Sequence, residues 1–157
     1  MANTMRWRYG STNPVMLPVD AATVIEIGDL LYLDTDDAKP ASALADQGTE
    51  SLNQQAFQDR FVGVAMQCSA AGETAPIRAA TSGVFEFDCD ASTHEVGALL
   101  GTAEDPGGAA LEDQKLAAVA GVNAAVGRCA KRVNPSGARV LVDVVSTVMK
   151  GGAQAAA

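Results

Sequence analysis

The sequence contains little of what most catalytic and metal-binding sites are built from. Phe, Trp and Tyr make up only 4% of the 157 residues, and there is one histidine. The three cysteines (Cys68, Cys89 and Cys129) have no metal-ligand spacing, whereas a catalytic zinc site normally needs several His or Cys ligands. Their odd number favours a reduced, intracellular chain over a disulfide framework. We expect no metal and no cofactor.

Positive charge and long apolar runs are also scarce. The net charge is −8 and the pI is near 4.4, whereas proteins that bind nucleic acid usually present a basic face. Only Lys131-Arg132 and Arg6-x-Arg8 gather cations locally. No apolar run approaches the roughly 18 residues of a membrane helix, and residues 1–10 lack the apolar core of a signal peptide. We expect neither direct nucleic-acid binding nor a membrane span.

Catalytic motifs are missing as well. Ser82 does not stand in a Gly-x-Ser-x-Gly elbow, and no phosphate-binding glycine motif is present. The acidic run 34–37 has alanines at 38 and 45, where a calcium loop needs oxygen ligands. His94 is more readily a turn or surface histidine than a catalytic base. The expectation is therefore that the protein is not an enzyme, with a small β-barrel hydrolase using His94 as the weakest alternative.

What the sequence does contain is a copy of itself. Residues 26–31 (EIGDLL) return as 95–100 (EVGALL), and residues 61–65 (FVGVA) return as 125–129 (AVGRC). The order is the same and the offsets differ by five residues, which one shorter loop would explain. Repeats of this size predict a duplicated structural unit, although chance similarity between short Gly/Val/Leu strings is the alternative.

The pattern between these strings is that of β-strands. Phe85, Phe87 and Cys89 alternate with Glu86 and Asp88, as in a half-buried strand. Further strands are expected from alternation and β-branched residues in four segments, and the Ala-rich segment 116–130 could be helix or strand. These four segments are 23–34 (two short strands joined at Gly28-Asp29), 61–66, 94–100 and 139–148. Residues 34–40 predict a polar loop, and 51–59 a short helix capped by Ser51.

We therefore predict a mainly β fold: a compact β-barrel or β-sandwich-like domain built from a duplicated β unit, with one or two short helices and an extended N-terminal arm. Residues 1–22 form the arm, 23–150 the single β-rich domain, and 151–157 a flexible tail. The internal repeat covers about 24–88 and 93–148. The small side chains of such a core would gain from assembly with other subunits.

The arm is the predicted partner-binding segment. It gathers an indole, a phenol and two guanidinium groups within four residues, and its prolines favour extended chain. Trp, Tyr and Arg are the residues most enriched at interface hot spots, although Trp7 and Tyr9 could instead fold back on the chain's own core. The candidate interface residues are Arg6, Trp7, Arg8, Tyr9, Pro14 and Pro18.

Several of these strings resemble the head-decoration (capsid cement) proteins of tailed bacteriophages. The resemblance is carried by residues 57–65, 71–87, 95–99 and 125–128, and it covers most of residues 20–149. It implies a β-rich virion protein, a homotrimer that binds the outer surface of the expanded capsid and cements neighbouring major capsid proteins. It also implies an N-terminal segment that lies on the capsid and orders on binding. The alternative is a carbohydrate- or host-surface-binding β module displayed on a virion.

Overall fold

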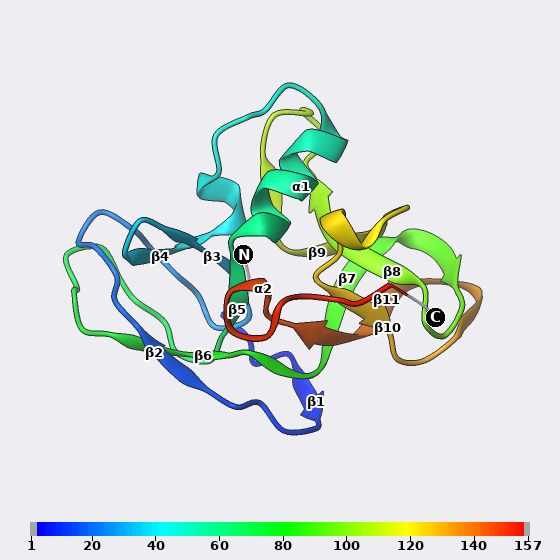
Figure 1. Ribbon diagram of the computed structural model, residues 1–157, viewed down its shortest axis with the longest axis horizontal. Helices are drawn as coiled ribbons and strands as arrows, with labels where there is room; N and C mark the ends of the chain where they lie inside the picture. The colour runs from blue at the N-terminus through cyan, green and yellow to red at the C-terminus, as the bar shows by residue number, and fades with distance from the viewer. Residues whose placement is uncertain (1–2, 156–157) are drawn as a thin grey trace.

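Strands dominate the computed structural model, which describes residues 3–155 (Figure 1). Five short strands build one sheet, and six strands, of which two are 13 residues long, build the other. The strands are β1 (Trp7–Tyr9), β2 (Val15–Leu17), β3 (Leu30–Asp34), β4 (Asp37–Pro40), β5 (Phe61–Ala65), β6 (Ile77–Ala80), β7 (Ser82–His94), β8 (Leu99–Glu104), β9 (Leu111–Ala118), β10 (Gly127–Cys129) and β11 (Val133–Val145). The helical elements are η1 (Ala41–Ala43), α1 (Glu50–Asp59), η2 (Val122–Ala124) and α2 (Thr147–Lys150). The predicted mainly β fold with short helices is confirmed.

Two groups of five strands have the same order. One sheet runs β2-β6-β5-β3-β4, and the other runs β7-β11-β10-β8-β9 with β1 added at β7. We call residues 15–80 unit 1 and residues 82–145 unit 2. They form the left and right halves of the molecule in Figure 1. The sequence repeat is therefore a repeat of structure, with β2 to β6 matching β7 to β11 in turn.

The repeated turn makes the same hydrogen bonds in both units. In unit 1 the amide of Gly28 donates to Ala65 O (2.9 Å), and the amide of Ala65 donates to Asp29 O (2.9 Å). In unit 2 the amide of Gly97 donates to Cys129 O (2.8 Å), and the amide of Cys129 donates to Ala98 O (2.8 Å). Gly28 (φ 99°) and Gly97 (φ 88°) both adopt the left-handed conformation that glycine favours. This requirement explains why the Glu-x-Gly string survives in both copies.

The central strand pair also has one register in both units. Leu31 lies opposite Gly63 in unit 1, and Leu100 lies opposite Gly127 in unit 2. A Cβ on Gly63 would overlap the backbone carbonyl of Ala80, and one on Gly127 would overlap that of Asp143. Each unit therefore needs glycine here, because the backbone of the neighbouring strand, β6 in unit 1 and β11 in unit 2, lies too close to this position for any side chain.

The units differ in how their ends meet. In unit 2, β7 pairs in parallel with β9 through Asp88↔Lys115 and Cys89↔Leu116, which closes a five-stranded barrel. In unit 1, the corresponding strands β2 and β4 have no ladder among the described residues. One bond, from the Ala38 amide to the Pro18 carbonyl (2.9 Å), spans this gap. Unit 2 is a closed barrel, and unit 1 is an almost closed one.

The unequal offsets have a different cause from the single shorter loop that we predicted. The β8–β9 hairpin is longer than the β3–β4 hairpin, and the connection from β9 to β10 is shorter than that from β4 to β5. The second change outweighs the first, since only the longer connection contains α1. The five-residue difference is the net result of the two changes.

Helix α1 belongs to unit 1 in sequence but packs on unit 2. Its Gln54 side chain donates to Thr102 O on β8 (2.9 Å), and Asn53 donates to Glu104 Oε2 (2.8 Å). Its cap is Thr49, whose hydroxyl accepts from the Leu52 amide. The predicted helix is confirmed, but Ser51 is not its cap because the helix begins one residue earlier.

Two apolar cores result. A small core fills unit 1, and a large core fills the unit 2 barrel and extends to α1 and the outer side of β3 and β5. Leu31 faces the small core, while its neighbours Leu30 and Tyr32 face the large one. All four phenylalanines are buried in the large core (Phe57, Phe61, Phe85 and Phe87). The phenylalanines are thus concentrated in the one core to which both units contribute.

Two local predictions need correction, and one that was left open between helix and strand is decided. Residues 34–40 are not a polar loop: they make a tight turn and strand β4, in which Pro40 lies opposite Leu31. The segment 23–34 has one strand instead of two, because Ile25 makes only an isolated bridge to Ser69. In the Ala-rich segment 116–130, β9 and β10 flank the short helix η2, so strand prevails over helix.

Candidate partner-binding surface

Strand β1 lies at the edge of the unit 2 sheet and presents apolar side chains to solvent. It pairs with β7 on one side through Trp7↔Phe85 and Tyr9↔Val84. Among the described residues no strand pairs with its other side, and Figure 1 shows β1 projecting at the lower margin of the molecule. Exposed strand edges with apolar side chains are unusual because they invite association with other chains.

Every second residue of this segment is large, apolar and exposed. Met5, Trp7 and Tyr9 have 39%, 42% and 52% of their surface exposed, and we call these three side chains the β1 surface. The pairing with β7 shifts register between Trp7 and Tyr9, so the exposure of both side chains belongs to an irregular strand edge and not to a regular two-residue period. Trp7 and Tyr9 therefore do not fold back into the core, which was the alternative left open by the sequence.

The Trp7 indole and the backbone next to it are held in place before any partner binds. The Trp7 Nε1 donates to Gly10 O at 3.0 Å, and Gly10 turns the chain with φ 89°. Arg8 Nη2 lies 3.1 Å from Glu86 Oε1 on the neighbouring strand. Burial opposes ionisation of Glu86, but hydrogen bonds from Arg139 and Arg8 outweigh it and lower the pKa of this carboxyl. A surface fixed in this way loses little conformational entropy on binding.

Arg6 has a different role from the one predicted. Its side chain is only 7% exposed, so it does not offer its guanidinium to a partner. Instead Nη2 donates to Gln114 Oε1 on β9 (2.9 Å), and Nη1 lies 3.3 Å from Asp88 Oδ1 on β7. Arg6 fills the space where β1 and β9 follow one another along the same edge of β7.

The Arg6 contacts continue into a buried carboxylate of unit 1. Gln114 Nε2 donates to Asp29 Oδ1 at 2.8 Å, and the Glu26 amide donates to Asp29 Oδ2 at 2.9 Å. Burial raises the pKa of Asp29 to about 6, although both hydrogen bonds favour its charged form. Burial also raises the pKa of the nearby Asp113. The arm, the repeated turn of unit 1 and β9 of unit 2 thus meet in one polar junction.

The rest of the arm is part of the fold. Pro14 and Pro18 are exposed, but between them β2 pairs with β6, and Leu17 and Val19 are buried in the unit 1 core. Removing residues 1–18 would delete two strands and part of a core. Such a truncation therefore tests folding as much as binding, and point substitutions are needed to test the β1 surface.

His94 lies at the end of β7 and is buried, not on a turn or at the surface as predicted. Its Nε2 is 2.9 Å from Ser92 Oγ, and the Ser92 hydroxyl donates to Asp90 O at 2.9 Å. With its proton directed at the carbonyl, Ser92 accepts from the imidazole. This is the reverse of the arrangement in which a histidine activates a nucleophile.

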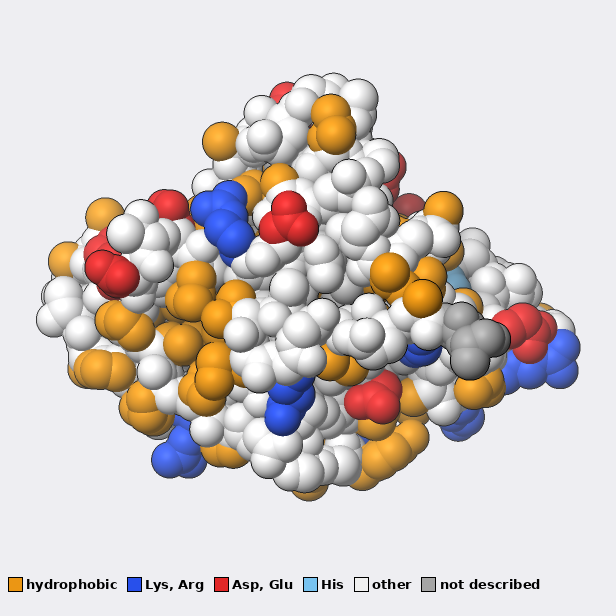
Figure 2. Space-filling view, viewed as in Figure 1, with side chains coloured by type: hydrophobic (Ala, Val, Ile, Leu, Met, Phe, Trp, Pro, Cys, Tyr) orange, Lys and Arg blue, Asp and Glu red, His pale blue; other side chains and the backbone are white. Residues whose placement is uncertain are grey.

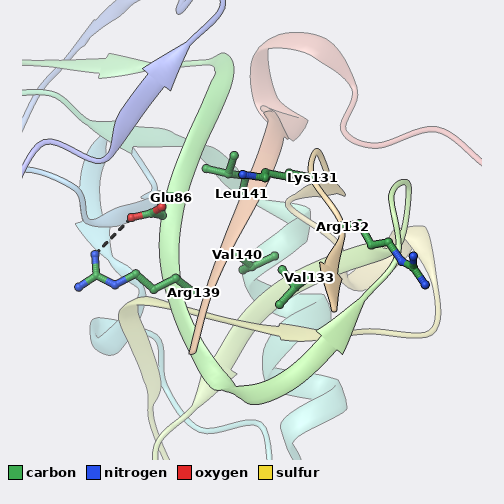
Figure 3. A pocket seen from close by; sticks show the side chains of 7 residues that line it. All are labelled: Glu86, Lys131, Arg132, Val133, Arg139, Val140 and Leu141. Atoms are coloured by element: carbon green, nitrogen blue, oxygen red, sulfur yellow. Dashed lines mark hydrogen bonds and ion pairs between the residues drawn. The ribbon is translucent and has the colours of Figure 1, made fainter. Parts of the chain in front are cut away.

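A shallow groove lies beside the β1 surface, and the Lys131-Arg132 pair is its only signal among the sequence motifs. It has a volume of about 230 Å³ and is lined by Glu86, Lys131, Arg132, Val133, Arg139, Val140 and Leu141. In Figure 3, Arg139 reaches Glu86 and Arg132 points away from the other lining residues. Lys131 and Arg132 lie between β10 and β11, and Arg139 lies within β11, so their spacing in the sequence carries no motif.

Across residues 3–155 no three His, Cys, Asp or Glu side chains form a group that could hold a metal ion. In the same range no helix has the length and hydropathy needed to cross a membrane. All three cysteines are free thiols, with Cys68 exposed.

No protein-family model matches the chain, and no match was found among curated proteins or solved structures.

Proposed function

We propose that this protein is a structural virion protein that binds the outer surface of the expanded capsid of a tailed bacteriophage and cements neighbouring major capsid proteins. The β1 surface is the observation that carries the proposal. Three exposed apolar side chains lie on β1 or just before it, and the two on β1 are aromatic residues of the kind that dominate binding energy at interfaces. Their attachment to a rigid sheet makes them suitable for docking on another protein.

The charge and the sequence resemblance support the same partner. An acidic protein of net charge −8 suits a position outside the shell, away from the packaged genome. A site shared by adjacent capsid subunits exists only in the expanded lattice, so binding stabilises that state by linkage. Assembly as a homotrimer would add avidity to a modest affinity of each subunit.

Co-sedimentation with phage heads tests this function. We expect saturable binding to expanded, decoration-free heads and none to unexpanded proheads. Replacing both Trp7 and Tyr9 by alanine should weaken binding at least tenfold, because hot-spot truncations cost about 2 kcal/mol or more. The matched control replaces Leu52 and Val96, which are apolar residues away from β1 with 49% and 67% of their surface exposed. Equal binding by the two double variants would contradict the assignment of the β1 surface.

The alternative is a carbohydrate- or host-surface-binding module. The observation that favours it is again the exposed pair Trp7 and Tyr9, since aromatic faces can stack on sugars. A glycan array separates the two functions: a sugar hit that is lost with Trp7→Ala, together with no binding to heads, would favour the carbohydrate module.

A further inference from the structure

Two grooves of the molecule are lined by equivalent segments of the two units. The unit 1 groove, of about 400 Å³, lies between the segment after β5 and the start of β6. The unit 2 groove, shown in Figure 3, lies between the segment after β10 and the middle of β11. The shared register, in which Val64 pairs with Ala80 and Arg128 with Asp143, aligns them residue by residue.

Only the unit 2 groove is basic. Its lining residues Lys131, Arg132 and Arg139 stand where unit 1 has Gln67, Cys68 and Pro76, respectively. The lining of the unit 1 groove contains no cation and one acid, Glu73. The duplicated scaffold does not need these charges, because its other copy forms the same groove without them.

The cations of the unit 2 groove remain accessible. Lys131 has no ion pair among the described residues, and the Arg139 side chain is 64% exposed although it pairs with Glu86 at 3.2 Å. Arg132 pairs with Glu95 at 3.0 Å and is turned away from the groove. Leu141 lies between these groups on the outward face of β11 and gives the groove an apolar strip.

The groove is continuous with the β1 surface. Glu86 on β7 lies 3.1 Å from Arg8 on β1 and 3.2 Å from Arg139 on β11, so one carboxylate joins the two regions. Figure 2 shows Lys and Arg side chains scattered over both halves of the face that it views. A partner that covers β1 and extends across β7 therefore meets positive charge on an otherwise acidic protein.

We propose that the unit 2 groove binds an extended acidic segment of the protein that docks on β1. This inference rests on the proposed function in naming that partner as the capsid subunit. Carboxylates of the segment pair with Lys131 and Arg139, and an apolar side chain lies on Leu141. Charges at such a rim act chiefly by speeding association and fixing orientation.

A peptide titration tests the groove without phage heads. The probe is a fluorescein-labelled peptide of alternating Asp and Val, with an Asn/Val peptide as the neutral control, and binding is measured by anisotropy. We expect binding of the acidic peptide only, weakened about tenfold by Lys131→Glu. Lys150→Glu makes the same charge change on exposed α2, and it should change affinity less than twofold.

Four outcomes overturn the proposal. The first two are an equal loss of peptide affinity in Lys131→Glu and Lys150→Glu, and binding of the neutral peptide as tight as that of the acidic one. The other two are complete displacement of the acidic peptide by millimolar inorganic phosphate, and its release when the protein associates with itself. Head binding separates the inference from the proposed function. If the wild-type chain and Lys131→Glu sediment equally with expanded heads, the function stands and the groove is not used. If the wild-type chain does not sediment, the function fails, and the peptide titration still decides whether the groove binds acidic segments.

Discussion

Unit 1 and unit 2 share a strand order, a turn and a central glycine, but they use the common scaffold differently. Unit 2 closes its barrel with the β7–β9 pair, encloses the large core and carries β1 on its edge. Unit 1 leaves its ends joined by one backbone bond and provides α1, which covers part of unit 2. The comparison separates what the fold requires, which is present twice, from what is present once and is free to serve a partner.

The shared glycines give the largest expected effect. Gly63→Ala and Gly127→Ala should each reduce the free energy of unfolding by about 3 kcal/mol or more, because the new Cβ meets a backbone carbonyl that cannot move away. Urea denaturation measures both. Gly107→Ala, which meets only the side chain of Asp105 in ordinary contact, should cost less than about 0.5 kcal/mol. A small effect at one of the two glycines alone would show that the units are packed less alike than their registers indicate.

The arm offers a comparison between two arginines two residues apart. Arg6→Ala should cost about 2 kcal/mol, because the buried Gln114 carbonyl oxygen loses its donor at the junction of the two units. Arg8→Ala removes only an exposed pair with Glu86 and should cost at most about 1 kcal/mol. Thermal and urea unfolding of both variants test this order, and the reverse order would contradict the assignment of Arg6 as the residue that joins arm and barrel.

The smallest effect concerns a single difference in the repeated turn. Asp29 of unit 1 is buried, whereas unit 2 has Ala98 at the same place. The pKa of Asp29 is about 6 in the folded chain and 3.8 without the fold, so the folded state binds the extra proton between these values. The free energy of unfolding should therefore rise by about 1 kcal/mol as the pH falls from 7 to 5. Asp29→Asn should flatten this rise, and an unchanged slope would assign the proton uptake to another group.

The sequence predicted the duplication because its signal is local. A turn that needs glycine at positive φ keeps that glycine in both copies, and the alternation of Phe85, Phe87 and Cys89 reports which side of a strand is buried. Trp7 and Tyr9 could be selected as interface candidates from their composition, but their exposure could not, since the sequence left open that they fold back on the core. Strand β4 could not be predicted, since its polar residues are stabilised by pairing with β3 and not by their own preferences.

The predictions that failed depend on partners distant in sequence. Nothing near Arg6 indicates that Asp88 and Gln114 will surround it, so its burial was not foreseen. Nothing near Gln54 indicates a bond to β8. The basic groove was missed for the same reason, because its lining residues come from the segment before β11, from the middle of β11 and from β7, which meet only in the fold.

The position of α1 bears on how the chain folds during synthesis. The helix leaves the ribosome with unit 1, but β8, which carries its hydrogen-bond acceptors, is made about 50 residues later, by sequence position. Until then Phe57 lacks most of the core that will bury it. Despite its duplicated design, the chain therefore has little opportunity to fold one copy at a time, and its final packing must await the arrival of the second.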